Sequence, residues 1–93
     1  MPYKLFLSHS TKDKVLIKWF YRRYTKAGYK VIIASKERPL RYPGYLPEKI
    51  KKLIRSCDCV IVLLTKNGIA SSWVNQEVGY TLEKKPLITI VDA

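Results

Sequence analysis

The run from Cys59 to Leu64, Cys-Val-Ile-Val-Leu-Leu, limits the folds open to this chain more than any other segment. It is a continuous series of β-branched and aliphatic residues, which is typical of a strand covered on both faces rather than of one with a solvated side. Such a strand needs structure packed above and below it. The sequence therefore favours a sheet between two layers of helices.

Further short apolar runs alternate with segments long enough to be helices. Three of these runs read as strands, at Tyr3–Leu7, Lys30–Ala34 and Leu87–Val91. Helix-length connections between strands require parallel pairing and right-handed crossovers. The sequence thus predicts an α/β fold, a doubly wound parallel sheet of four strands in the order 2-1-3-4 with three helices.

Local signals mark where the first two helices begin and end. Ser10, with Asp13 three residues later, predicts the N-terminal cap of the first helix, and Gly28 ends that helix. The proline- and glycine-rich segment Ser35–Tyr45 is predicted to be a long loop. Pro47 suits the first turn of the helix that follows.

The third helix follows a predicted turn at Asn67-Gly68 and is capped by Ser71 or Ser72. We expect one stripe of this helix to face the core, formed by Val74, Val78 and Leu82.

Composition excludes several classes of function. The chain has 93 residues, enough for one domain, with 18 Lys and Arg against seven Asp and Glu. The basic residues are spread along the chain without a nucleic-acid-binding motif, so we expect attraction to phosphates but not nucleic-acid binding. With His9 as the sole histidine we expect no metal site. No apolar run is long enough for a membrane span or signal peptide.

The two cysteines, Cys57 and Cys59, would point to the same face of one strand, a poor geometry for a disulfide. Free, buried thiols and a cytoplasmic location are therefore expected.

Trp73 and Glu77 lie four residues apart near the start of the third helix, and this spacing makes them neighbours. We expect them at the border of the apolar stripe, where a ring can stack on a flat ligand and a carboxylate can meet a positive charge. The alternative is a solvated glutamate beside a half-buried tryptophan.

Topology places the same pair at a binding crevice. Open parallel sheets bind ligands beyond the carboxyl ends of their strands, where the strand order reverses. Three segments meet there in the predicted fold, namely residues 8–10, 35–45 and 65–77. Trp73 and Glu77 belong to the third segment.

These residues resemble the Toll/interleukin-1 receptor (TIR) domain family, in its microbial form. The resemblance spans the whole chain, 1–93, and rests on Leu5–Ser10 with Asp13, Pro43-Gly44, Ile54–Asp58, Val60–Leu64, Ser72-Trp73 and Glu77. It implies a flavodoxin-like fold and, in many members, cleavage of NAD between nicotinamide and ribose. NAD would be a substrate, and no further cofactor is implied.

The resemblance also implies roles for individual residues. Glu77 matches the catalytic glutamate, and the binding residues would be Trp73, Ser8, His9, Ser10, Lys36, Arg38 and Leu46. Ser8, His9 and Ser10 would line the nicotinamide end of the pocket. Nicotinamide is already a cationic leaving group, so Glu77 would chiefly stabilise a sugar cation, and the nearby helix start should keep it ionised.

Two features depart from the family pattern. Ala34 stands where many relatives have an acidic residue, and the usual last strand and helix are lacking, as expected of a trimmed or reduced member.

The resemblance favours a domain that hydrolyses or cyclises NAD in immune, antiphage or stress signalling and associates with itself or with other TIR domains. The main alternative is a TIR–TIR interaction module without chemistry. A nucleoside deoxyribosyltransferase-like enzyme, which also uses a glutamate, is less favoured because a neutral base needs more acid–base help than this chain offers.

Overall fold

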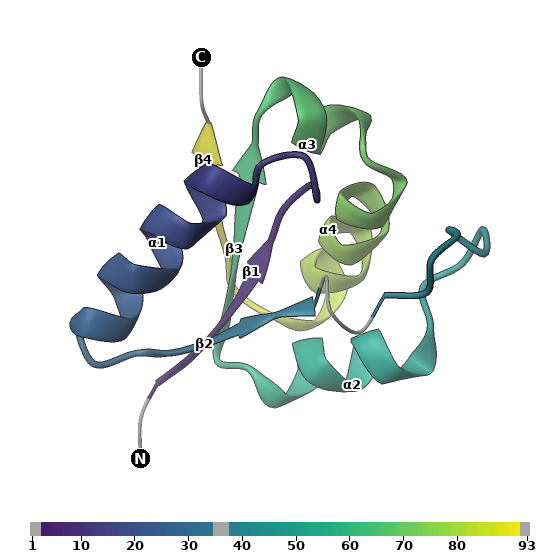
Figure 1. Ribbon diagram of the computed structural model, residues 1–93. Coiled ribbons are helices and arrows are strands. Elements are labelled where there is room, and N and C mark those ends of the chain that lie inside the picture. Colours follow the sequence, from purple (N-terminus) through teal and green to yellow (C-terminus); the bar gives the residue numbers. More distant parts are fainter. Residues whose placement is uncertain (1–2, 35–37, 92–93) are drawn as a thin grey trace.

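The computed structural model describes residues 3–34 and 38–91, and for 87–91 the backbone alone (Figure 1). The described elements are, in order, β1 (Lys4–Ser8), α1 (Lys14–Lys26), β2 (Lys30–Ile33), α2 (Glu48–Ser56), β3 (Cys59–Leu64), α3 (Lys66–Ala70), α4 (Ser72–Lys84) and β4 (Leu87–Val91). The strands pair in parallel in the order β2-β1-β3-β4. The predicted α/β class is confirmed, with β1 between β2 and β3.

Helices cover both faces of the sheet, α1 on one side and α2 with α4 on the other (Figure 1). Because strand side chains alternate, Leu5 and Leu7 of β1 face α1, whereas Phe6 and Ser8 face the α2–α4 side. Both faces of β3 are buried, as its apolar run predicts. Removing each such side chain from water stabilises the fold by about 1.5–3 kcal/mol.

The first loop is held differently from the prediction. Asp13, not Ser10, occupies the N-cap position of α1, and it makes no side-chain cap hydrogen bond. Its carboxylate accepts instead from the Thr65 hydroxyl at 2.6 Å and the Asn67 amide at 2.8 Å. Ser10 accepts from the backbone N–H of Lys12 at 3.2 Å. The predicted cap was wrong, because the carboxylate finds partners on the segment after β3.

A short helix replaces the turn predicted at Asn67-Gly68. The helix α3 is capped by the Thr65 hydroxyl, which accepts from the Gly68 N–H at 2.9 Å. A Cβ added at Gly68 would overlap the carbonyl oxygen of Leu63, so this helix needs glycine there. Five residues are too few to show a helical period. The described residues therefore form four helices, not the three predicted.

The two thiols lie on opposite faces of the sheet, which corrects the prediction that they share one. Cys57 packs in the core beneath α2, while Cys59 belongs to the core beneath α1. Cys57 lies before β3 begins, so the strand's alternation does not extend to it. Both thiols are free and buried. Burial raises the pKa of Cys57 to about 11, so this thiol stays protonated at neutral pH.

Two features are absent from the described ranges, 3–34 and 38–91. No helix there is long and apolar enough to cross a membrane. No three histidine, cysteine, aspartate or glutamate side chains gather there as a metal-binding group.

Candidate functional site

Glu77 lies at the centre of the buried face of α4. The helix starts after Ser71, whose hydroxyl accepts from the Val74 N–H at 3.2 Å, so the predicted cap is confirmed. The buried residues of the helix are Val74, Glu77 and Thr81. Leu82, which was predicted to face the core, is 68% exposed. The predicted stripe is therefore confirmed at Val74 and wrong at Leu82, because the buried face of α4 runs through Glu77 and Thr81 instead.

The Glu77 carboxylate has no exposed surface, and residues far away in sequence bind both of its oxygens. The Ser8 hydroxyl donates to Oε1 at 2.8 Å. Arg38 donates from Nη2 to Oε1 at 2.6 Å and from Nε to Oε2 at 3.3 Å. The side chain of Arg38 is only 3% exposed. The acid is therefore held in a dry, bidentate ion pair at the carboxyl end of β1.

Two aromatic rings extend this cluster. The guanidinium carbon of Arg38 lies 5.5 Å from the centre of the Trp73 ring, in cation–π contact. Tyr42 meets Trp73 edge to face, with ring centres 4.9 Å apart and planes at 88°. The Tyr42 hydroxyl is buried and has no hydrogen-bond partner in the described part of the chain. Sequence reasoning placed Tyr42 only within a long loop, because nothing local links it to Trp73.

Burial and charge act against each other at Glu77. Burial raises the pKa of its carboxyl, while the Arg38 charge and the hydrogen bonds from Arg38 and Ser8 oppose this rise. The sequence predicted that the partial positive charge at the helix start would keep Glu77 ionised. Glu77 lies beyond the first turn of α4, where this charge has little effect. Arg38, rather than the helix, therefore favours the ionised acid.

The first loop divides between the two faces of the sheet. Ser8 points to Glu77, but the side chain of His9 lies among residues of α1 and β2, with Nδ1 3.3 Å from the carbonyl oxygen of Leu7. Only the backbone of His9 reaches the site, where its carbonyl accepts from Arg38 Nη1 at 3.0 Å. Burial lowers the pKa of the His9 imidazole. Of the three loop candidates, Ser8 alone contacts the acid with its side chain.

Leu46 and Lys36 are the remaining predicted binding residues. Leu46 is buried in the core beneath α2 and lines a shallow cavity of about 340 Å³ with Gly44, Gln76 and Tyr80. Lys36 lies outside the described residues.

Fold and site together define a small parallel α/β domain with a buried glutamate at the carboxyl edge of its sheet, paired with arginine and flanked by tryptophan. A family model described as TIR domain matches residues 5–92. The chain therefore belongs to the TIR domain family, as the sequence indicated. Comparison with curated proteins gives no match.

Among solved structures, the chain is similar to the TIR domains in a structure described as the activated Roq1 resistosome directly recognizing the pathogen effector XopQ. The TM-score is 0.74 at 20% sequence identity, over 96% of this chain and 57% of that one. At this identity the likeness extends to the fold alone. The chain spans little more than half the length of the protein chain that it matches.

Proposed function

We propose that this TIR domain cleaves NAD between nicotinamide and ribose, with Glu77 as the catalytic residue. The observation that carries the proposal is the buried carboxylate of Glu77, which already holds a cation, the Arg38 guanidinium, beside the face of Trp73. The transition state of NAD cleavage also places a cationic sugar next to a flat ring. The groups that now hold the Arg38 guanidinium therefore suit the two proposed roles. Glu77 would stabilise the sugar cation, and Trp73 would stack on the nicotinamide ring.

The reaction requires a change in the partner of Glu77. Because the carboxylate is fully buried, ribose contacts it only after Arg38 has withdrawn. The bond between the ribose carbon and the nicotinamide nitrogen then breaks, and its electron pair neutralises the pyridinium. Glu77 stabilises the resulting sugar cation until water adds to it and releases a proton, which gives ADP-ribose. Attack by the adenine of the same molecule, in place of water, gives the cyclic product.

The other site residues orient the substrate in this proposal. Trp73 stacks on the nicotinamide ring, and the buried hydroxyl of Tyr42, which has no partner among the described residues, bonds the substrate. Ser8 keeps one carboxylate oxygen in place. We assign the backbone of His9 to holding Arg38, and the second loop, with Lys36, Arg38 and Leu46, to gating access. Ser10 shapes the first loop.

We also propose that the domain works through self-association or contact with other TIR domains, in an immune or stress signalling role within the cytoplasm. The solved structure that it resembles is described as a resistosome. If neighbouring copies complete the site, the rate per subunit should rise with protein concentration. A constant rate would argue against assembly.

A TIR–TIR interaction module without chemistry is the second candidate, and one observation favours it. Ser8 and Arg38 bind both oxygens of Glu77, as they would if the acid served only to hold the two loops together. The two functions differ in whether nicotinamide is released.

The test is incubation with NAD and chromatography of nicotinamide, ADP-ribose and cyclic ADP-ribose. Wild type should release nicotinamide, and Glu77→Gln, which keeps the shape of the side chain, should lose this release while its circular dichroism stays native. Glu83→Gln on the exposed face of α4 is the matched control and should retain activity. Full turnover by Glu77→Gln contradicts the catalytic role. A wild-type protein that is inert at every concentration supports the interaction module.

A further inference from the structure

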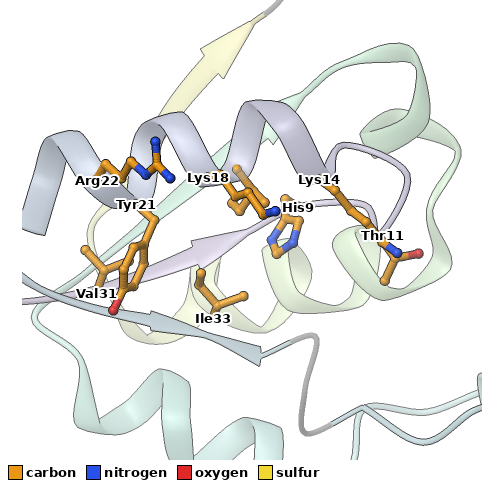
Figure 2. A pocket seen from close by; sticks show the side chains of 9 residues that line it. His9, Thr11, Lys14, Lys18, Tyr21, Arg22, Val31 and Ile33 are labelled. Atoms are coloured by element: carbon orange, nitrogen blue, oxygen red, sulfur yellow. The ribbon is translucent and has the colours of Figure 1, made fainter.

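A cavity of about 560 Å³ lies between α1 and β2, away from Glu77 (Figure 2). Its apolar lining, formed by Ile17, Val31 and Ile33, belongs to the core beneath α1. Trp73, by contrast, packs against the core on the opposite face of the sheet. The cavity is therefore distinct from the candidate active site, and its volume is typical of small-molecule sites.

One side of the cavity is strongly cationic. Lys14, Lys18 and Arg22 line it at four-residue intervals along α1, a helix that contains no acidic residue. Within the described residues, none of these three side chains is bonded to a carboxylate. Three cations over an apolar floor attract a ligand that has an anionic end and an apolar body.

Two neutral polar side chains share one end of the same cavity with Lys14. Figure 2 shows Tyr21 of α1 beside Val31 of β2, while His9, Thr11 and Lys14 lie toward the other end. Burial keeps the His9 imidazole neutral, and its Nδ1 lies 3.3 Å from the carbonyl of Leu7, which assigns the proton to Nδ1. Nε2 is then an acceptor, on a ring that lines the cavity.

We propose that this cavity binds a nucleotide, with its phosphate at Lys14 and Lys18 and its base against Tyr21 and the apolar floor, near Arg22. His9 accepts a hydrogen bond from the ligand through Nε2. A flat base suits the Tyr21 ring, which can stack on it. Inorganic phosphate would use only the cations, and it would leave the apolar floor in water. The nucleotide matches both halves of the cavity.

The test is an NMR titration of the isotope-labelled domain with AMP, and separately with adenosine and with inorganic phosphate. AMP should shift the amide signals of α1 and β2 and should bind at least about tenfold more tightly than either fragment, because each fragment lacks half of the contacts. Phosphate binding as tight as that of AMP, binding to anionic lipid vesicles in place of AMP, or shifts confined to α4 would each overturn the proposal.

Matched variants locate the site. Lys14→Gln with Lys18→Gln should weaken AMP binding about tenfold through the loss of two charge-assisted contacts. Lys52→Gln with Lys84→Gln, on α2 and α4, removes the same charge from the other face and should leave binding unchanged. Equal weakening by both pairs would show general attraction only and would overturn the proposal. Glu77→Gln should bind AMP as wild type does, so this result is independent of NAD cleavage.

Discussion

Two arginine–glutamate pairs among the described residues have similar shortest distances and opposite surroundings. Arg38 and Glu77 meet at 2.6 Å, with side chains 3% and 0% exposed. Arg55 and Glu48 meet at 2.9 Å, with side chains 44% and 61% exposed. Water and salt screen the second pair, and water can hydrate either charge if its partner is removed. Water does not reach the first pair, so removal of one member leaves the other charge buried without a partner.

The same contrast reverses the direction of the carboxyl pKa shifts. Burial raises the pKa of Glu77 despite its arginine, whereas the hydrogen bond from Arg55 lowers the pKa of Glu48. An arginine partner alone therefore does not decide whether an acid is easily ionised. What decides it is how much water the acid has lost on folding.

The largest effect should come from Arg38→Met, which keeps the bulk of the side chain and removes the charge. We expect a loss of about 3–5 kcal/mol in the free energy of unfolding, because Glu77 is left buried without a counter-ion. Urea denaturation measures this loss. Arg41→Met, an exposed change in the same loop, is the control. Adding Glu77→Gln to Arg38→Met should recover part of the stability, and equal stabilities of Arg38→Met and Arg41→Met would contradict the interpretation.

A smaller loss is expected for Ser8→Ala, which removes one hydrogen bond from the buried carboxylate. The cost should be about 1–3 kcal/mol, because the lost donor bonded a charged group that water does not reach. The same denaturation experiment applies. Ser72→Ala, at an exposed position of α4, should be nearly neutral. If Ser8→Ala is neutral as well, water reaches Glu77 and the site is not dry.

The difference between these two pairs also shows what the sequence could predict. Strands and crossovers follow from local apolar runs, so β3 and the parallel sheet were predictable. Pairing of Arg38 with Glu77 spans 39 residues and depends on how the second loop meets α4, which no local period reports. The five-residue helix α3 was missed for the related reason that it is shorter than any detectable period.

The alternation of side chains along β1 carries a further signal about the first loop. Ser8 at the end of the strand points to the face of Phe6, and His9 points the other way. This rule separates Ser8 from His9 on the sequence alone. Resemblance to a family groups the two residues together, because it matches positions and not directions.

The pH dependence of stability should also distinguish the buried Arg38–Glu77 pair from the exposed Arg55–Glu48 pair. The pKa of Glu77 is raised in the folded state, so its ionisation costs more there than in the unfolded chain. Wild type should therefore lose stability relative to Glu77→Gln as pH rises from below the ordinary carboxyl pKa through the raised one. Urea midpoints of both proteins across this range measure the difference. A difference that is constant with pH would mean that burial does not control this acid.

The smallest effect should be that of Glu48→Gln, and its pH dependence should have the opposite sign. The pKa of Glu48 is lowered by Arg55, so its contribution exists above the ordinary carboxyl pKa and fades as pH falls through the lowered one. Exposure of both side chains to solvent makes this contribution small, and added salt should remove it. Comparison of wild type and Glu48→Gln at low and high salt checks both points. If Glu48→Gln still loses stability in high salt, the Glu48–Arg55 pair depends on packing rather than charge. The difference between this pair and the Arg38–Glu77 pair would then not arise from hydration alone.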